Sequence, residues 1–288
     1  MTTQAPVPQV TIASLARRKR EGGGAEPFAC LTCYDATTAR WLARSGVHVL
    51  LVGDTAAEMV LGYPRTLDMP LDVLIALTAG VWRGSREPGR GCVPLVMGDM
   101  PFMSYHASPD DAVRNAGRFI VEGHADIVKL EMDATFAPLV DRLVRAGIPV
   151  CAHVGSRPQR VAITSGYASA GRTATDAQRV VEDAQALQDA GAQMLLVEAV
   201  PQETTAKLLQ IATVPVIGIG AGPACDGQVL VLQDLLGLTD GAPAFAKPVA
   251  QLGEQIENAG RQWVQKVATR AVGDSPYRMR DANGVKKA

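Results

Sequence analysis

The 288-residue chain lacks several features that would point to whole classes of protein. Its apolar runs are far shorter than the roughly 20 residues that a membrane-spanning helix needs. The formal net charge is only −1, so no surface for nucleic acid or for a membrane is expected. The first ten residues show no charged segment followed by an apolar one, so no signal peptide is expected. These absences favour an ordinary globular protein.

Cysteine is scarce as well, with five residues in the whole chain. An odd number of cysteines in a long chain argues for reduced thiols and a cytoplasmic location. Cys30 and Cys33 have the spacing of a redox motif, but they lie in the strand-like run "FACLTCYD". A low thiol pKa is favoured at the start of a helix instead. We interpret the pair as side chains of a buried strand.

What the chain does contain is an alternation of short β-rich runs with helix-like segments. Most of the runs are continuously apolar, which is typical of parallel strands covered on both faces. The strand candidates are "PFACLTCYD", "VHVLLVGD", "CVPLVMGDM", "ADIVKLEM", "IPVCAHVG", "AQMLLVEAV", "VPVIGIGAG" and, more weakly, "APAFAKPV". Between them lie amphipathic segments, one of which begins with a capping Ser108 followed by Pro109.

Eight such strands in a chain of this length predict an α/β fold, a single (β/α)₈ barrel domain over residues 1–288. A doubly wound sheet is the alternative, but no glycine-rich dinucleotide turn follows the first strand. Residues 11–270 are expected to form the ordered barrel and its flanking helices. These include an N-terminal helix at the bottom of the barrel and a long helix that ends near Thr269. Residues 273–288 are expected to be a flexible tail.

Acidic residues end four of the strand candidates. They are Asp54, Asp99, Glu131 and Glu198. In a parallel barrel the carboxyl ends of the strands meet at one rim, where active sites lie. His153 ends a fifth candidate, and Lys129 precedes Glu131 by two residues, so both point the same way. The sequence therefore predicts that these six side chains converge.

Four carboxylates so close together would repel one another unless a cation joined them. A helix cap or a loop hydrogen bond would explain any one of them, whereas four in register favour a metal and acid–base site. Oxygen ligands without cysteine or paired histidine favour a hard cation, Mg²⁺ first and Mn²⁺ or Ca²⁺ after it. Lys129 is placed to meet a substrate carboxylate, or it serves only as a salt-bridge partner.

Seven motifs in collinear order, from about Thr11 to Lys247, resemble the successive signatures of one family. They are "VGDT", "GDMPFMSY", "DIVKLE", "PVCAHVG-x-x-P", "LLVEAVP", "VPVIGIGAGPACDGQVLV" and "FAK". The family is ketopantoate hydroxymethyltransferase, or 3-methyl-2-oxobutanoate hydroxymethyltransferase. The resemblance implies a TIM barrel of the phosphoenolpyruvate/pyruvate superfamily. It also implies a cytoplasmic enzyme that assembles as a homo-oligomer, usually a homodecamer.

The resemblance implies a reaction in pantothenate biosynthesis. A hydroxymethyl group is transferred from 5,10-methylenetetrahydrofolate, the co-substrate, to 3-methyl-2-oxobutanoate, which gives 2-dehydropantoate (ketopantoate). The cofactor is Mg²⁺. Asp54 and Asp99 match the metal-binding aspartates of the family, and Glu131 matches the acid that holds the metal through water.

The remaining site residues are carried over in the same way. Glu198 matches the catalytic base that removes a proton from C3 of the 2-oxo acid, which forms an enolate. The substrate-binding positions match Thr55, Asp99, Lys129 and His153. The hydroxyl group of Thr55 is expected to meet the substrate carboxylate.

Three segments depart from the family pattern, namely residues 55–58, residues 156–157 and the loop around 168–170. They keep open an alternative, a related metal-dependent aldolase or hydroxymethyltransferase that acts on a different 2-oxo acid. A lyase of the isocitrate lyase kind would need a catalytic cysteine in a K-[KR]-C-G-H loop, which is absent. A barrel kept only as a scaffold would be expected to lose the metal ligands or the base, and all of these are present.

Overall fold

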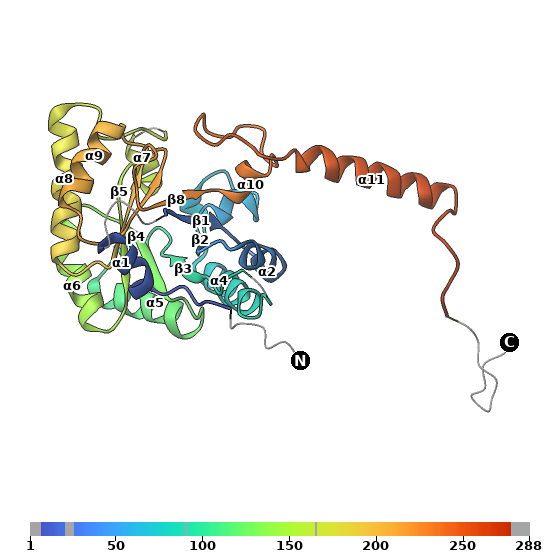
Figure 1. Cartoon of the computed structure of the whole chain (residues 1–288), viewed down its shortest axis with the longest axis horizontal. Coiled ribbons are helices and arrows are strands. Elements are labelled where there is room, and N and C mark those ends of the chain that lie inside the picture. Colours follow the sequence, from blue (N-terminus) through green and yellow to red (C-terminus); the bar gives the residue numbers. More distant parts are fainter. Residues whose placement is uncertain (1–6, 21–25, 90, 165, 278–288) are drawn as a thin grey trace. The chain divides into compact units, whose positions relative to one another are not determined.

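The computed structural model describes residues 7–20, 26–89, 91–164 and 166–277. Within these ranges eight parallel strands close into a barrel in sequence order, and β8 pairs with β1. The strands are β1 Phe28–Thr32, β2 Val49–Val52, β3 Leu95–Asp99, β4 Ile127–Glu131, β5 Val150–Gly155, β6 Met194–Glu198, β7 Val216–Ile219 and β8 Gly227–Leu230. Helices surround the strands (Figure 1). The predicted (β/α)₈ barrel is confirmed.

One helix precedes the first strand, and the others lie between the strands and after the last strand. They are α1 Ile12–Arg20, α2 Ala36–Ser45, α3 Ala56–Met59, α4 Leu71–Ser85, α5 Pro109–Val121, α6 Ala137–Arg145, α7 Val161–Thr164, α8 Ala174–Asp189, α9 Gln202–Ile211, α10 Leu232–Leu235 and α11 Leu252–Ala268. Three 3₁₀ turns accompany them, η1 Thr66–Asp68, η2 Ala134–Phe136 and η3 Pro158–Arg160. Ser108 caps α5 as predicted, because its side chain accepts a hydrogen bond from the backbone N–H of Asp111.

Two layers of buried apolar side chains hold the barrel together. One layer lies between the strands and the helices, and strand residues such as Leu50, Val128 and Leu195 belong to it. The other fills the barrel interior with residues such as Val49, Met97 and Cys151. Alternate residues of a strand therefore face the two layers, which explains why the runs are continuously apolar.

The N-terminal helix closes the bottom of the barrel, as predicted. Leu15 of α1 is almost completely buried and packs with the interior layer. Lys19 Nζ forms an ion pair with Asp226 Oδ2 at 3.0 Å, and Asp226 immediately precedes β8. The helix therefore contacts the end of the barrel where the strands begin, opposite to the end with the predicted acids.

The eighth strand is not the one predicted. The run "APAFAKPV", residues 242–249, forms turns, whereas β8 is formed by "GQVL" at Gly227–Leu230. Pro243 and Pro248 lack the backbone N–H that a strand between two neighbours must donate. The run "GQVL" is short and half polar. Its first residue must be glycine, because a Cβ at Gly227 would lie only 2.4 Å from the ring of Phe28.

A close helix contact involves α2 and α4. A Cβ added at Gly84 of α4 would lie 2.1 Å from the carbonyl oxygen of Ala36 at the start of α2. At Gly80, one turn earlier on the same helix, an added Cβ would meet nothing within 4 Å. Gly84 is therefore required by the packing of the two helices, and Gly80 is not.

All five cysteines are buried and unpaired by disulfides. Burial raises the pKa of Cys33 and of Cys151 to about 12, so both thiols are protonated at neutral pH. Cys30 lies on β1 and Cys33 follows this strand by one residue. These positions agree with the interpretation of the pair as buried structural side chains.

The chain divides into two compact units, one up to Leu232 and one from Gln233. The second unit contains α11, on which no residue is buried, as well as the turns that precede it. The single-domain organisation stays a prediction, and residues 278–288 of the expected tail lie outside the described ranges.

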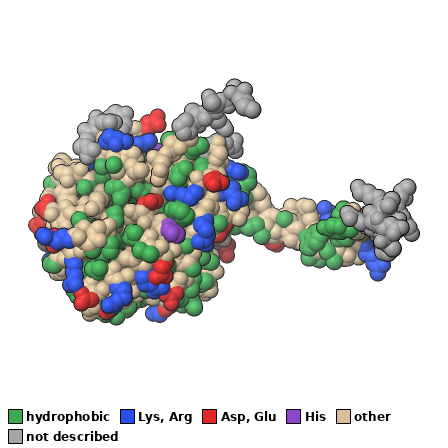
Figure 2. All heavy atoms as spheres, turned by 90° about the horizontal axis from the view of Figure 1, so that it is seen from below, with side chains coloured by type: hydrophobic (Ala, Val, Ile, Leu, Met, Phe, Trp, Pro, Cys, Tyr) green, Lys and Arg blue, Asp and Glu red, His purple; other side chains and the backbone are tan. Residues whose placement is uncertain are grey.

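Among the helices of the described ranges, none combines the length and the apolar character that crossing a bilayer requires. Figure 2 shows basic and acidic side chains interspersed over one face.

Candidate active site

The barrel brings the predicted residues to the carboxyl ends of its strands. Asp99, Glu131 and Glu198 are the last residues of β3, β4 and β6. Strand register places Asp99 beside Lys129, and Glu131 beside His153. Asp54 follows β2 by two residues. His153 lies two residues before the end of β5, not at its end as the sequence suggested.

The centre of the site is a buried ion pair. Lys129 Nζ lies 2.8 Å from Asp99 Oδ1, and both side chains are at most 5% exposed. The backbone N–H of Asp54 donates to the other oxygen, Asp99 Oδ2, at 3.0 Å. Although burial opposes the charge of Lys129, the nearby Asp99, Asp54 and Glu131 raise its pKa above the usual value. Lys129 is therefore a permanent cation.

One ammonium does not balance the buried acids around it. Burial raises the pKa of Asp99 to about 7 despite the opposing charge of Lys129, and Asp54 raises it further. Burial likewise raises the pKa of Glu131 well above its usual value. Asp99 Oδ1 is buried and accepts no aligned hydrogen bond from the described residues, so its 2.8 Å contact with Lys129 is an ion pair. The site therefore favours additional positive charge.

His153 connects this buried group to Glu198. Burial and the charges of Lys129 and Arg157 lower the pKa of His153 well below its usual value, so the ring is neutral. Its Nδ1 lies 3.5 Å from Lys129 Nζ, and an ammonium can only donate, so Nδ1 is an acceptor. The ring proton is then on Nε2, which lies 3.4 Å from Glu198 Oε2.

Glu198 is the acid that solvent reaches. Its side chain is 23% exposed, in contrast to the almost fully buried His153. Burial raises the pKa of Glu198 to about 7, with a further increase from Asp54 and Asp99 and an opposing effect of Lys129. A carboxylate with a pKa near neutrality is suited to accept and return protons.

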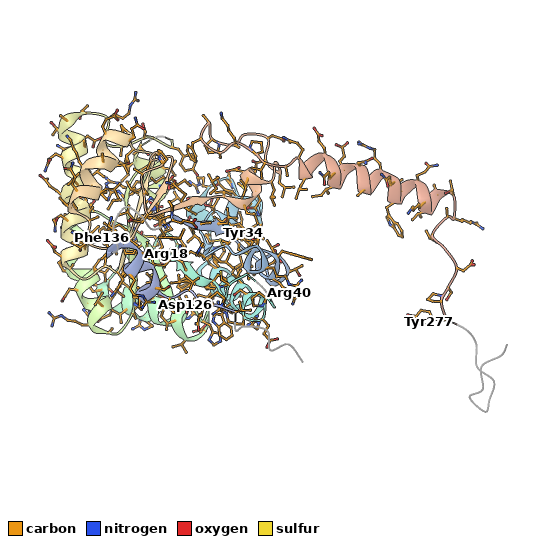
Figure 3. The ribbon with its side chains drawn as sticks, viewed as in Figure 1. Arg18, Tyr34, Arg40, Asp126, Phe136 and Tyr277 are labelled. Atoms are coloured by element: carbon orange, nitrogen blue, oxygen red, sulfur yellow. The ribbon has the colours of Figure 1, made fainter. Side chains whose placement is uncertain are left out.

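Two more residues belong to the site, one that the sequence predicted and one that it did not. Thr55 is the residue immediately before α3, and its side chain makes no capping hydrogen bond. Gln159 in η3 was not predicted, yet it is only 4% exposed and donates to Asp54 Oδ2 at 2.9 Å. Tyr105 donates to Oε1 of Gln159 at 2.7 Å, and its ring packs edge-on against Phe136, which is labelled in Figure 3.

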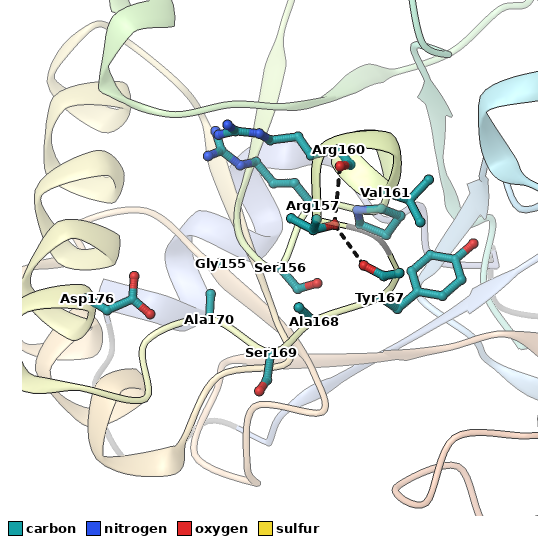
Figure 4. A pocket seen from close by; sticks show the side chains of 13 residues that line it. Gly155, Ser156, Arg157, Arg160, Val161, Tyr167, Ala168, Ser169, Ala170 and Asp176 are labelled. Atoms are coloured by element: carbon teal, nitrogen blue, oxygen red, sulfur yellow. Dashed lines mark hydrogen bonds between the residues drawn. The ribbon is translucent and has the colours of Figure 1, made fainter.

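A pocket of about 290 Å³ lies at the end of β5, where Gly155 and Ser156 line it (Figure 4) and pair with the backbone of Glu198. Its wall follows the chain after β5, where the backbone N–H of Ser156 donates to the carbonyl oxygen of Glu198. Arg157 and Arg160 lie next to each other, and Tyr167 lies away from them. Arg157 Nη1 contacts Asp133 Oδ2 at 2.7 Å. The pocket thus combines cationic, hydroxyl and aromatic side chains.

The sequence of this barrel matches a known enzyme family over most of its length. The family model of ketopantoate hydroxymethyltransferase matches residues 9–274. The chain belongs to that family. The enzyme from Pyrobaculum arsenaticum named 3-methyl-2-oxobutanoate hydroxymethyltransferase is 45% identical over 87% of this chain and 92% of its own length. The protein of the same name from Anaeromyxobacter sp. (strain K) is 43% identical over 96% and 90%.

Solved structures with the same fold are more distant. A phosphonopyruvate hydrolase in complex with oxalate and Mg²⁺ is 11% identical, with a TM-score of 0.60, over 91% of this chain and 88% of that chain. A 2,3-dimethylmalate lyase, described as a member of the PEP mutase/isocitrate lyase superfamily, is 19% identical with a TM-score of 0.55, over 93% and 100%. These similarities agree with the barrel of this ketopantoate hydroxymethyltransferase family member.

The acids of this family member have the donor chemistry of a divalent-cation site. Among the described residues, no three histidine, cysteine or acidic side chains converge as a ready-made metal cluster. Mg²⁺, however, commonly uses one or two carboxylates and takes its other ligands from water and substrate. Three observations fit that donor set. Asp54 and Asp99 lie next to each other, Oδ1 of Asp99 accepts no aligned hydrogen bond from the described residues, and the buried acids around them outnumber the one ammonium group.

Proposed function

We propose that this family member transfers a hydroxymethyl group from 5,10-methylenetetrahydrofolate to 3-methyl-2-oxobutanoate, which gives 2-dehydropantoate for pantothenate biosynthesis. Its family membership supports the reaction. The observation that carries the proposal is Glu198, a partly exposed carboxylate whose pKa is about 7, beside the neutral ring of His153 and above the buried acids. The free-thiol cysteines support a cytoplasmic location.

Asp54 and Asp99 would hold Mg²⁺, with Glu131 acting through water. When bound, Mg²⁺ would polarise the 2-oxo group of the substrate and so favour loss of a C3 proton. Lys129 supplies a positive charge beside Asp99 that opposes the effect of burial and favours the ionised form of this carboxyl group. It would also attract the substrate carboxylate toward the site. The hydroxyl group of Thr55, which makes no capping hydrogen bond to α3, would donate to that carboxylate.

Glu198 would remove the proton from C3. Its ionised form accepts the proton, and a pKa near 7 lets the carboxyl group return it later. Nε2 of His153 lies 3.4 Å from Glu198 Oε2 and makes no aligned hydrogen bond in the described part of the chain, so this ring nitrogen would be near the carboxylate when the proton is transferred. The almost complete burial of Asp99 and His153 keeps bulk water from the enolate that forms.

We place the one-carbon donor in the pocket beside Glu198. A reduced folate carries a flat aromatic ring and carboxylate groups. Tyr167 offers a ring for stacking, and Arg160 offers a guanidinium that is 45% exposed. The carbon that the donor carries would then lie near the C3 atom from which Glu198 takes the proton.

We also propose that the chain assembles as a homo-oligomer, with a homodecamer as the expected state. Support comes from α11, where large apolar side chains are exposed by half or more. They are Ile256, Trp263, Val264 and Val267. Exposed apolar side chains repeated along one helix are typical of a surface that another chain covers. Light scattering on the full chain gives the number of subunits.

A second candidate, a related enzyme with a different 2-oxo acid, is favoured by one observation. Tyr167 donates to Glu58 Oε1 at 3.3 Å, so a residue of the first departing segment contacts the residue just before the third. Ala56 and Ala57, also in the first segment, are completely buried beside Thr55. A change in the size of this region would change which substrate side chain fits.

Proton NMR in D₂O tests both candidates with a panel of 2-oxo acids and Mg²⁺, with and without the folate. If the chain is the 3-methyl-2-oxobutanoate enzyme, the C3 proton of this acid should exchange, and 2-dehydropantoate should form only when the folate is present. Glu198→Gln should abolish the exchange and the product. Faster reaction of another 2-oxo acid supports the second candidate. Absence of exchange with every acid would refute the enolate mechanism.

A further inference from the structure

Gln159 is a buried amide at the mouth of the barrel that the mechanism above does not use. It lies in η3, four residues after the end of β5, and is 4% exposed. Buried amide groups are expensive unless they are hydrogen-bonded, so the contacts of such a side chain are informative.

Its contacts reach the ends of three strands other than its own. The side-chain Nε2 donates to Asp54 Oδ2 at 2.9 Å and to the carbonyl oxygen of Met100 at 3.0 Å. The backbone N–H donates to Glu131 Oε2 at 2.9 Å. Tyr105 donates to Oε1 at 2.7 Å. One residue from the segment after β5 is therefore bonded to the carboxylates that follow β2 and end β4.

These partners also fix the orientation of the amide. In the reverse orientation, Oε1 would face the carboxylate of Asp54 and the carbonyl of Met100, and oxygen would oppose oxygen. The Tyr105 hydroxyl reinforces the observed orientation because it donates to Oε1. Asp54 Oδ2 is thus held by an N–H donor of the amide.

We propose that Gln159 is a positioning residue that holds the carboxylates of Asp54 and Glu131 in the arrangement that binds a divalent cation. The inference rests on the cation of the proposed function and assigns a role to a residue that would not itself touch the ion. Residues that hold metal ligands in place typically change metal affinity about 10- to 100-fold when they are replaced.

The test is the affinity of the full-length, substrate-free protein for Mn²⁺, measured by calorimetry and by the EPR signal of free Mn²⁺. Gln159→Met keeps the approximate length of the side chain and removes its hydrogen bonds. We expect the Kd for Mn²⁺ to rise about 10- to 100-fold. This readout does not depend on turnover.

Gln188→Met is the matched control. Gln188 is also a buried amide that uses both of its ends, because Nε2 donates to the carbonyl oxygen of Ile211 and Oε1 accepts from the N–H of Thr213, each at 2.9 Å. It lies on α8, away from the acids. Its replacement is expected to lower thermal stability and to leave the Kd for Mn²⁺ unchanged within about twofold.

Tyr105→Phe provides a second variant that leaves the amide in place. It removes the donor that orients Oε1 and also the 3.1 Å contact of the hydroxyl group with the carbonyl oxygen of Glu131. We expect the Kd for Mn²⁺ to rise about two- to tenfold. In the Gln159→Met background the same change should have a smaller effect on the Kd, since the contact with Oε1 is already absent.

The outcomes separate this proposal from the proposed function. Wild-type affinity in Gln159→Met overturns the positioning role while the hydroxymethyl transfer stands. An equal loss of affinity in Gln188→Met also overturns it, because the effect would then be one of general stability. If Gln159→Met does not fold, wild-type affinity in Tyr105→Phe overturns the proposal. No binding of Mn²⁺ to the wild type refutes both the positioning role and the proposed cation site.

Discussion

Replacing Glu198 with glutamine should make the cation-free protein more stable while it stops the proton transfer. A carboxyl pKa raised from 4.5 to about 7 means that ionising Glu198 in the fold costs about 3 kcal/mol relative to the unfolded chain. Glutamine has the same size and carries no charge, so Glu198→Gln avoids this cost. For a chain of this length the gain corresponds to a rise in Tm of roughly 6 to 10 °C.

The sign of this effect depends on pH. Below about pH 4.5 the carboxyl group is protonated in both states, so the variant gains nothing. Between pH 4.5 and 7 the unfolded chain loses the proton first, and the gain grows with pH. Above about pH 7 the group is ionised in both states, and the full gain is present. The stability advantage should therefore appear at pH 8.5 and be absent at pH 4.5.

Thermal unfolding of both proteins in EDTA, at several pH values in one set of buffers, measures this difference. Glu203→Gln on α9 is the control, because Glu203 is exposed and its replacement should leave Tm unchanged. An advantage of Glu198→Gln that is equal at pH 4.5 and 8.5, or absent at both, would refute the raised pKa. The role of Glu198 as a base poised near neutrality would then lose its physical support.

Exchange of the C3 proton of 3-methyl-2-oxobutanoate should fall about tenfold per pH unit below about pH 7, because only ionised Glu198 accepts a proton; a flat NMR profile in D₂O would point to another base. Lys129→Met should lower the free energy of unfolding, measured by urea denaturation, by about 3–5 kcal/mol, since it leaves Asp99 buried without its counterion. A loss below about 1 kcal/mol would show that this ion pair matters little for stability. Gly84→Ala should lower the free energy of unfolding by about 1–3 kcal/mol. Gly80→Ala should raise it by roughly 0.5–1 kcal/mol. If Gly80→Ala were the more destabilising of the two, α2 and α4 would not be in close contact. EDTA should abolish the proton exchange and Mg²⁺ should restore it, and full exchange in EDTA would argue against a cation requirement.

The barrel and the strand-end acids could be predicted because both follow from local patterns. Continuous apolar runs mark parallel strands, and a residue such as Asp99 or Glu131 at the end of a run must lie at the rim of the barrel. The eighth strand could not be found in this way. Its sequence, "GQVL", is too short and polar to stand out, and closure of the barrel between β7 and β1 imposes the strand conformation on it.

Gln159 shows the other limit of the sequence. It lies in a polar loop, "SRPQR", whose composition predicts only a turn. Its burial arises because this loop reaches the ends of β2, β3 and β4, a contact between residues far apart in the chain. The one available signal was its place immediately after the proline of a recognised motif.

The burial of every cysteine gives the protein a practical property. Thiols that stay protonated react slowly with alkylating reagents, because the thiolate is the nucleophile. A cysteine introduced at Ile163 on α7, which is 74% exposed, would be modified long before any native one. A fluorophore or spin label could then report on the segment beside the pocket without prior removal of the native cysteines.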